Sequence, residues 1–522
     1  MSVGSYLTSP SYSSTNTLTQ EKENIEKKRK LSGLLKKKRA EIGDWIPMNG
    51  NYHYDIPNCE VYLKDPLLTL RSGAQRLDIF LLFFDRTFLQ QVWDSHPLDT
   101  WIYRNSGGKV GNKTKDRVLK QKTINSGRFS LKILYGYLTI CIYIAGNCHT
   151  TEQTKSNRPI RTAIEKAKTY FATKYSGIKT IGIEICELLI SRFRITADMF
   201  ALLSKNFQSI IERLGEYVAG DEKLFHFTGN SGDIRLVPSK PDHVGLWFYE
   251  LSCRLNNKLP FMLYIRLHNS WTAVNQKISV SSIVTDWVDV IVKLSHKWLD
   301  KNDDSESNVE QEHELLQQLD NTTTDTQRFL SYGVKYNTIL FYDSLYMDNT
   351  ARITCNETKV GFIASAKSNF FQSLFDMVKT DVERPGQFKG IYNETTNECF
   401  VHVWDKDTNI GKKNVLTNAV VVNKRKKQSE YSIPFYDTYS IGFRVCDQFN
   451  RNLHDRTWPF RSGGNGVPGD EGMTTNFAFA VTLQNTFNAY RCINKVDHGS
   501  YDFRAYCNEL AEELLQYSHN LP

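Results

Sequence analysis

The residue pattern changes from helical to extended near residue 221, and this change restricts the possible folds more than any other feature. From 60 to 215 the apolar residues recur mainly at helical spacing. After 221, three strand-like runs are separated by turns, FHFTGN at 225–230, GLWFYELSC at 245–253 and PFMLYIRLHN at 260–269. The chain therefore combines a helical region with a sheet-forming region.

An amphipathic helix is predicted after the third strand-like run. Ser281 and Ser282 cap it, and its large apolar residues share one broad face, namely Ile283, Val284, Trp287, Val288, Ile291, Leu294 and Trp298. Two more strand-like runs follow, YNTILFYDS at 336–344 and KVGFIASAK at 359–367. Three antiparallel strands, a helix and two further strands are the order of a ribonuclease-H-like fold. We therefore predict an α+β protein with a mixed five-stranded sheet and helices.

Two acidic residues stand where this strand order makes them neighbours. Asp221 lies at the start of the extended region, and Asp343 ends the fourth strand-like run. On adjacent strands their carboxylates would lie side by side. The alternatives are structural, since Asp221 suits a turn after Gly220 and Asp343 suits the cap of a strand end.

The length of 522 residues predicts two or three domains, and a hydrophobic content of 40% allows a sizeable core. We predict that a ribonuclease-H-like core is interrupted by an insertion and flanked by helices. The segments are a disordered basic arm at 1–58, a helical DNA-binding or dimerisation domain at 59–218, the first part of the core at 219–367, an insertion subdomain at 368–430, the last part of the core at 431–449, and C-terminal helices at 450–522 that pack on the helical domain.

Basic clusters and a net charge of +8 favour a polyanionic partner. Two clusters near the N-terminus are typical of a nuclear import signal or a DNA-backbone arm, and a third lies in the predicted insertion. The alternative for the first two is the solvated end of a basic helix. The predicted DNA-binding residues are Lys27, Lys28, Arg29, Lys36, Lys37, Lys38, Arg39, Lys424, Arg425, Lys426 and Lys427. A basic loop at 104–127 is a further candidate for phosphate contacts.

The ten cysteines are scattered singly, with no C-x-x-C pair, so neither a structural zinc module nor a disulfide framework is predicted. This pattern favours a reducing compartment. The most apolar window, at 133–146, is too short to span a bilayer comfortably and is predicted to be a buried helix. No membrane association and no secretory signal are expected.

The stretch from 221 to 251 resembles a sequence block of the piggyBac family of transposases and transposase-derived proteins. That block has an Asp-Glu pair, Phe-x-Gly, a Pro-x-Lys-Pro turn, and a Gly before an aromatic strand. The matching residues are Asp221, Glu222, Phe227, Gly229, Pro238, Lys240, Pro241, Gly245 and Trp247. Weaker matches in the same order extend the resemblance over about 60–522, including SRFRITADMF at 191–200 and the W-x-D segment at 404–407.

The resemblance implies DNA cleavage and strand transfer by three carboxylates that hold two Mg²⁺ ions. Two such ions stabilise the attacking and leaving oxygens of an in-line displacement at phosphorus. Asp221 and Asp343 match the first two positions and are the implied metal ligands. At the third position, within YDTYSIGFRVCDQ at 436–448, Arg444 replaces the family's Asp. A guanidinium cannot bind a metal ion, and beside the two acids it would be expected to pair with them.

The sequence leaves three functions open. The first is a transposase-derived DNA-binding protein whose cleavage and strand-transfer activity is lost or weakened. The second is an active transposase in which Asp447, or less directly Asp437, takes the third acidic position, although three residues along a helix move a carboxylate by several ångströms. The third is a non-catalytic scaffold or a partner of an active transposase. DNA, a homodimer or a hetero-oligomer with a related transposase are the implied partners, and a nuclear location is expected.

Overall fold

The structure is a computed structural model, and the residues that it describes fall into separate ranges. They are 45–48, 67–95, 130–147, 158–178, 180–181, 186, 189, 193–215, 217–226, 233–238, 243–255, 259–268, 280–299, 336, 338–367, 371–379, 382–385, 387–404, 412–419, 421–425, 428–432, 444–451, 453, 469–496 and 502–522. Most of the predicted basic arm, with Lys27 to Arg39, lies outside the described residues, as does the loop at 104–127.

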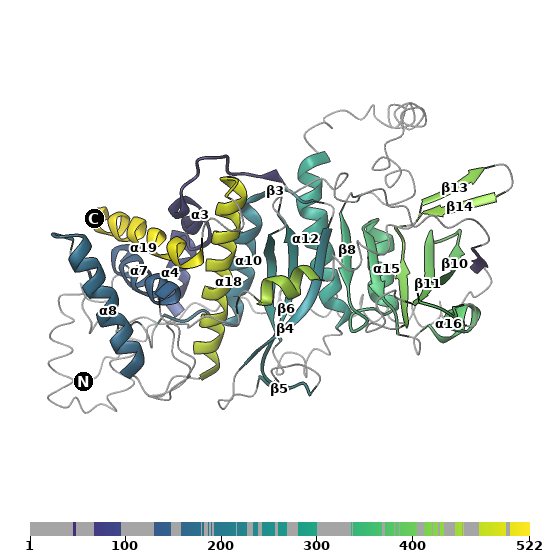
Figure 1. The fold of residues 1–522 in the computed structure, drawn as a ribbon, viewed down its shortest axis with the longest axis horizontal. Helices are drawn as coiled ribbons and strands as arrows, with labels where there is room; N and C mark the ends of the chain where they lie inside the picture. The colour runs from purple at the N-terminus through teal and green to yellow at the C-terminus, as the bar shows by residue number, and fades with distance from the viewer. Residues whose placement is uncertain are drawn as a thin grey trace, which may run out of the picture.

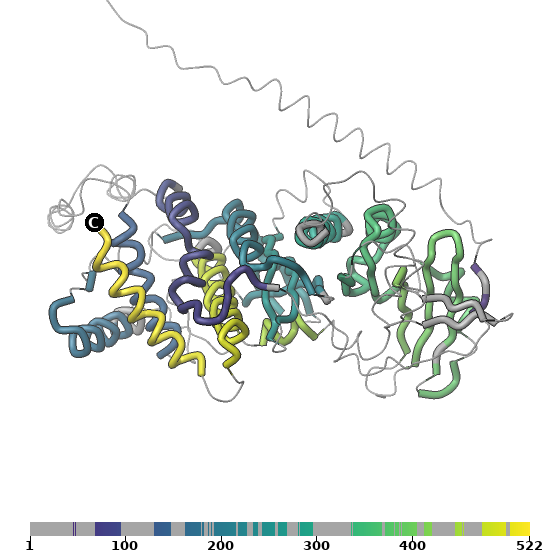
Figure 2. Tube along the Cα trace, turned by 90° about the horizontal axis from the view of Figure 1, so that it is seen from above, coloured from purple at the N-terminus to yellow at the C-terminus, as the bar shows by residue number. Residues whose placement is uncertain are grey.

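Most of the helices gather at one end of the molecule, and the large sheet with the remaining helices forms the other (Figure 1). The helical end holds α3 (Arg76–Phe83), α4 (Arg86–Ser95), α7 (Leu131–Asn147), α8 (Arg158–Lys174) and α10 (Phe200–Ser209), together with the C-terminal α18 (Gly469–Ile493) and α19 (Phe503–Asn520). The short strands β2 (Leu67–Leu68) and β3 (Ile211–Arg213) pair beside them, and η3 (Ala197–Met199) precedes α10. Figure 1 shows α10 and α18 between the other helices of this end and the sheet, and Figure 2 shows, from above, the yellow C-terminal helices among the blue and purple helices of the N-terminal half.

The predicted buried helix is α7, which contains the apolar window at 133–146. It packs mainly on α19, where Gly146 lies so close to Cys507 that a Cβ added to it would stand 2.6 Å from the Cys507 Cβ. Lys132 donates to the carbonyls of His519 and Leu521 and so caps the end of α19. None of the helices in the described ranges combines the length and apolar character needed to cross a bilayer.

The central strands run in the order β7-β6-β4-β8-β9. They are β4 (Tyr217–His226), β6 (Val244–Arg254), β7 (Pro260–Leu267), β8 (Ile339–Tyr342) and β9 (Gly361–Ser365). β4 pairs antiparallel with β6 and parallel with β8, and β8 pairs parallel with β9. Along the chain, α12 (Ser281–Leu299) joins β7 to β8, and α15 (Asn349–Thr358) joins β8 to β9. The sheet is therefore mixed, as the sequence predicted.

The five-stranded prediction was too narrow, because the sheet has ten strands. β9 pairs with β12 (Lys412–Thr417), and the sheet continues through β11 (Glu398–Trp404), β10 (Phe388–Asn393) and β1 (Trp45–Pro47). At the other end β5 (Ile234–Leu236) pairs with β6. Most of the strands from the predicted insertion thus extend the core sheet, while β13 (Val421–Arg425) and β14 (Gln428–Ser432) form a separate hairpin. The short helix α16 (Gln372–Val378) packs on β10 and β11.

Helices cover both faces of the central sheet. On one face Trp287 of α12 packs so closely on β4 that a Cβ at Gly220 would stand 2.3 Å from its ring, so this contact requires glycine. On the other face Phe477 of α18 stacks on Phe248 of β6, with ring centroids 4.0 Å apart. Residues 444–451 form a further helix on that second face, where Val445 and Cys446 join Ala219 and Phe341 in one buried cluster.

Side chains from α10 and α18 close the outer edge of β7. Asn485 of α18 accepts the Met262 N–H and donates to the Met262 carbonyl, both at 2.9 Å. From α10, Gln208 donates to the Leu263 carbonyl and Ser204 accepts the Ile265 N–H. An edge strand presents unpaired backbone groups, and these side chains satisfy them. The helical region is thereby hydrogen-bonded directly to the sheet.

Candidate functional site

Asp221 and Asp343 occupy matching positions on neighbouring strands. In the parallel pairing of β4 and β8, Gly220 is opposite Tyr342, so the residues that follow each of them, Asp221 and Asp343, are next in register. Adjacent strands lie about 4.8 Å apart. Both acids also share one face of the sheet, because Ala219 and Phe341, two residues before them, belong to the same buried cluster. The structure thus brings together the first two predicted positions.

Backbone hydrogen bonds hold both carboxylates at this end of the sheet. The Oδ1 of Asp221 accepts the Glu222 N–H at 2.8 Å, and the Oδ1 of Asp343 accepts the Ser344 N–H. Asp221 is partly buried and Asp343 is exposed. After Asp343 the chain turns back, with the Tyr346 N–H donating to the Asp343 carbonyl at 3.1 Å. The two acidic side chains are therefore held at this end of the sheet.

The helix at 444–451 is fixed on the same face by two side-chain hydrogen bonds. The thiol of Cys446 donates to the Ala219 carbonyl at 3.2 Å, two residues before Asp221 on β4. Asn450 donates from Nδ2 to Oε2 of Glu250 at 2.9 Å, and both of these side chains are buried. Glu250 stands directly opposite Asp221 in the pairing of β4 with β6. The helix that carries the third predicted position is thus docked beside the first acid.

The charges of three carboxylates act on the buried thiol of Cys446. Burial raises the pKa of its thiol well above the usual range, and the nearby charges of Asp221, Glu250 and Asp447 raise it further. Asp447 is exposed on the outer side of the helix. Asp447 belongs to no metal-holding cluster in the described ranges, so its role at the third acidic position stays a prediction.

Arg444 does not pair with the two acids, so that expectation was wrong. It lies on the exposed side of its helix, and no ion pair joins it to another residue in the described ranges. The buried side of the helix is formed by Val445, Cys446 and Phe449 instead. Because these three residues face the sheet, residue 444 lies on the side of the helix that faces solvent.

The acids do not close into a metal site in the part of the chain that the structure describes. No cluster of three or more His, Cys, Asp or Glu side chains there is arranged to hold a metal ion. Asp348, which follows Asp343 closely in the sequence, is occupied as the N-cap of α15, where it accepts the Ala351 N–H at 2.9 Å. The donor set therefore does not fit the two-metal site that the sequence resemblance implies, and Asp437 lies outside the described residues.

Several residues around this site were not predicted from the sequence. Glu250 and Asn450 are 200 residues apart and meet only through the strand pairing and the helix docking. Tyr346 donates to Glu222 at 2.6 Å, and burial together with the charges of Glu222 and Asp221 raises the pKa of its hydroxyl well above the usual range. The Asp-Glu pair in the sequence was the only local signal, and it pointed to Asp221 rather than to these contacts.

The third basic cluster falls on the β13–β14 hairpin. Lys424 and Arg425 end β13, and Arg425 is opposite Gln428 in the pairing. Lys426 and Lys427, between the two strands, lie outside the described residues. Figure 1 shows this hairpin apart from the large sheet.

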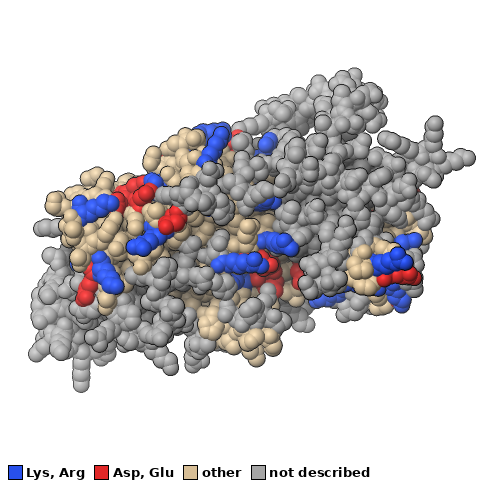
Figure 3. Space-filling model, viewed as in Figure 1, with Lys and Arg blue, Asp and Glu red and all other residues tan. Residues whose placement is uncertain are grey.

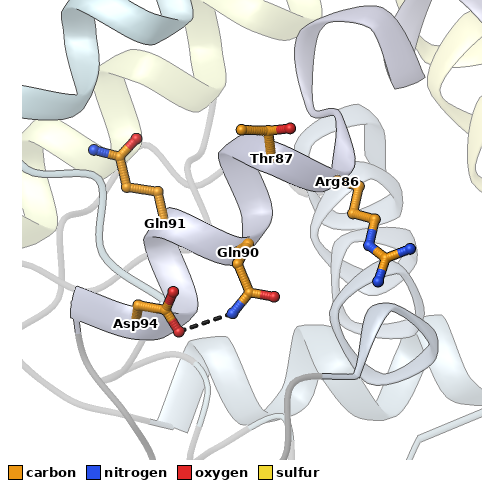
Figure 4. A pocket seen from close by; sticks show the side chains of 5 residues that line it. All are labelled: Arg86, Thr87, Gln90, Gln91 and Asp94. Atoms are coloured by element: carbon orange, nitrogen blue, oxygen red, sulfur yellow. Dashed lines mark hydrogen bonds between the residues drawn. The ribbon is translucent and has the colours of Figure 1, made fainter.

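A shallow, open hollow lies on the polar side of α4, in the helical region (Figure 4). Its lining residues are Arg86, Thr87, Gln90, Gln91 and Asp94. Gln90 donates to Asp94 at 2.8 Å along the helix, an ordinary contact one turn apart. The hollow is formed by one helix and holds none of the predicted acids.

Comparisons with known proteins agree with this architecture at the level of the fold. No protein-family model matches the chain, and no curated protein matches it. Among solved structures, one of the piggyBac transposase synaptic complex with hairpin DNA matches with a TM-score of 0.55. The match covers 87% of this chain and 83% of that chain at 12% sequence identity. The chain therefore has a fold similar to that of piggyBac transposase.

Proposed function

We propose that this protein is a transposase-derived DNA-binding protein in which DNA cleavage and strand transfer are lost or strongly weakened. The observation that carries the proposal is the site itself. Asp221 and Asp343 are in register on parallel strands, while the third position is occupied by an exposed Arg444. The similarity to a transposase bound to DNA supports DNA as the partner.

The proposal includes a ribonuclease-H-like core. Its support is the order β7-β6-β4-β8-β9 with a helix on each connection from β7 onward. In this arrangement the first and fourth strands are adjacent and parallel, which places an acid from each at one end of the sheet. Carboxylates gathered in this way repel one another, so their function depends on a cation.

The loss of activity follows from the chemistry of the third position. Two divalent ions stabilise the attacking and leaving oxygens of a phosphoryl transfer, and they require oxygen ligands. A guanidinium has five N–H donors and no acceptor, so Arg444 cannot bind such an ion. Its positive charge near the rim of the sheet suits contact with a DNA phosphate instead.

The test compares cleavage and binding in four forms of the protein, wild type, Arg444→Asp, Arg444→Gln and Asp221→Ala. With Mg²⁺ or Mn²⁺ and DNA carrying terminal repeats, we expect salt-sensitive binding and no cleavage by the wild type. Arg444→Asp is expected to gain measurable nicking that the matched Arg444→Gln variant lacks. Asp221→Ala should bind DNA like the wild type. Robust cleavage by the wild type would contradict the inactive-site proposal, and absence of DNA binding at moderate salt would leave the scaffold as the better explanation.

A second candidate is an active transposase that uses Asp447 in the third position. It is favoured by one observation: Cys446, the residue before Asp447, donates to the Ala219 carbonyl on the strand that carries Asp221. It predicts Mg²⁺-dependent nicking by the wild type that Asp447→Asn abolishes. The same cleavage experiment therefore decides between the two candidates.

The remaining parts of the proposal concern partners and location. A homodimer or an assembly with a related transposase is proposed from the sequence resemblance, and size measurements with and without DNA will test it. The basic clusters containing Lys27 to Arg39 suggest nuclear import. Lys424 to Lys427 are proposed to contact phosphates from the β13–β14 hairpin, since a two-stranded ribbon suits a DNA groove.

A further inference from the structure

The end of the sheet that carries Asp221 and Asp343 also carries two cations that the sequence did not single out. Ala364 of β9 is opposite Tyr342, and Ser365 is opposite Val415 of β12 in an antiparallel pair. The start of β12, Lys412, is therefore at the same end of the sheet as Asp343. Only β9 lies between β8 and β12, which separates these strands by about 10 Å. The register also places Lys412 beyond the level of Asp343, by about 10 Å along the strand direction.

Lys412 is exposed but held in place. Its ammonium donates to the Val382 carbonyl at 2.8 Å and lies 4.5 Å from the centre of the Trp404 ring on β11. A mobile lysine side chain loses conformational entropy when it binds a ligand. Because these two contacts already restrict the Lys412 side chain, its binding to an anion would cost less entropy. An ammonium has three donors, and Lys412 has no other partner in the described ranges. It therefore retains donors for an anion.

Arg384 belongs to the same surface. It lies in the turn at 382–387, where the Gln387 side chain accepts the N–H groups of Glu383 and Arg384, both at 2.9 Å. The Gln387 carbonyl in turn accepts the Trp404 N–H at 2.9 Å, so the turn packs against β11. Arg384 is exposed and forms no ion pair with a described residue.

The neighbouring Lys379 differs from Lys412 and Arg384, and this contrast provides a matched control. Lys379 is exposed after α16, but its ammonium pairs with Asp376 at 2.6 Å. Figure 3 shows that Lys and Arg side chains are spread among acidic ones rather than gathered in one patch on this view. A surface of this kind attracts a polyanion through particular unpaired cations at fixed positions, not through a broad field.

We infer that Lys412 and Arg384 form a contact surface for the phosphate backbone of DNA that runs along the acid-bearing end of the sheet. The inference rests on the proposed DNA binding, and it adds the path that the DNA backbone takes across the protein surface. Phosphates follow one strand of a duplex every 3.4 Å along the axis, so a few base pairs span the distance between Asp343 and Lys412. Trp404 positions Lys412 and is not itself required to touch DNA.

The test measures DNA affinity by fluorescence anisotropy between 50 and 200 mM salt, using the full chain and a duplex of random sequence. Each lost phosphate contact lowers the slope of log affinity against log salt by about 1, so Lys412→Gln and Arg384→Gln are each expected to show this change. Lys412→Arg is expected to keep the wild-type slope, since it retains the charge. Lys379→Gln is the matched control and should leave the slope unchanged, because its ammonium is already paired with Asp376.

The outcomes separate the inference from the proposed function. If the wild type binds DNA and Lys412→Gln and Arg384→Gln keep its slope, the contact surface is refuted while DNA binding stands. An equal change in Lys379→Gln would also refute it, since the effect would then reflect net charge alone. If the wild type does not bind DNA, the proposed function and the contact surface are both refuted. Thermal unfolding of each variant, followed by circular dichroism, checks that a change in DNA affinity does not come from unfolding of the protein.

Discussion

Arg235, His268 and Tyr249 form a hydrogen-bonded chain near the acid-bearing end of the sheet. The Nη2 of Arg235 lies 2.8 Å from Nε2 of His268, and the Tyr249 hydroxyl lies 2.8 Å from Nδ1. Because a guanidinium only donates, Nε2 accepts, so the neutral ring carries its proton on Nδ1 and donates to Tyr249. Burial and the charge of Arg235 lower the pKa of His268. The arrangement therefore requires an uncharged imidazole.

The free energy of unfolding is expected to fall as the pH decreases from about 7.5 to 5. The pKa of His268 is lowered from 6.5 in the folded state, so the unfolded chain binds the proton first and is favoured in acid. The charged and titratable groups that act on the imidazole are Arg235, Arg266, Asp233 and Tyr249. Urea unfolding at several pH values will measure the effect. His268→Gln should show a shallower dependence than the wild type, and an equal slope in both would contradict the assignment.

At the scale of the element, the helix at 444–451 illustrates how a polar contact sets the position of a functional segment. It is short, so its own backbone hydrogen bonds stabilise it little, and docking decides its place. Its apolar residues Val445, Cys446 and Phe449 supply burial, which is not directional. The bond from Asn450 to the buried Glu250 is directional and fixes the helix on β6.

Asn450→Ala is expected to loosen this helix. Removing a donor from a buried carboxylate costs about 1–3 kcal/mol. A loss of that size raises the open population by about 5- to 150-fold, since 1.4 kcal/mol is a factor of ten. Alkylation of Cys446, followed by mass spectrometry of its peptide, should accelerate accordingly, with the buried Cys141 as an internal reference. Gln448→Ala, on the exposed side of the same helix, should label at the wild-type rate.

At the scale of the whole molecule, one buried ion pair connects the core to the strands of the predicted insertion. Glu398 of β11 is fully buried and accepts two hydrogen bonds of 2.6 Å from Arg352 of α15. Asn356, one turn further along α15, adds a third at 2.9 Å. A carboxylate in this position is stable only with its partners, because an unpaired buried charge is costly.

Arg352→Met is expected to destabilise the protein by about 3–5 kcal/mol, since it leaves the charge of Glu398 buried without its main partner. The double variant Arg352→Met, Glu398→Gln should recover a substantial part of that loss. Urea unfolding of the two single variants and the double variant gives the coupling energy. Additive losses would show that the pair does not act as a unit. Arg71→Met, which breaks a surface pair with Glu212, is the control and should cost less than about 1 kcal/mol.

The parts of the fold that could be predicted from the sequence are those that depend on residues close together in the chain. Four of the strand-like runs were predicted correctly because alternation and turn residues are local, and they fall on β6, β7, β8 and β9. The first run, at 225–230, was placed too late, because β4 already begins at Tyr217 and ends at His226. The place of Asp221 beside Asp343 followed from strand order alone. The pairing of Trp45–Pro47 with β10 joins segments more than 300 residues apart and leaves no local pattern.

The candidate site was predictable only in part, for the same reason. Arg444 was located by resemblance, but its orientation depends on which side of the helix Val445 and Cys446 bury, and that was not evident. Glu250 looks like any polar residue in an alternating strand, and its buried hydrogen bond from the docked Asn450 could not be seen in the sequence. Contacts between distant segments are decided by packing, which a single sequence does not record.

The ten-stranded sheet has a mechanical consequence. From β1 to β8 every neighbouring pair of strands is joined by backbone hydrogen bonds, over five spacings or about 24 Å. A load applied along the strands where β1 and β10 meet is therefore transmitted toward Asp343 through backbone hydrogen bonds in shear. Pulling or bending the far edge of the sheet would therefore strain the strands that carry Asp221 and Asp343. This load would not be taken up by the movement of a separate domain.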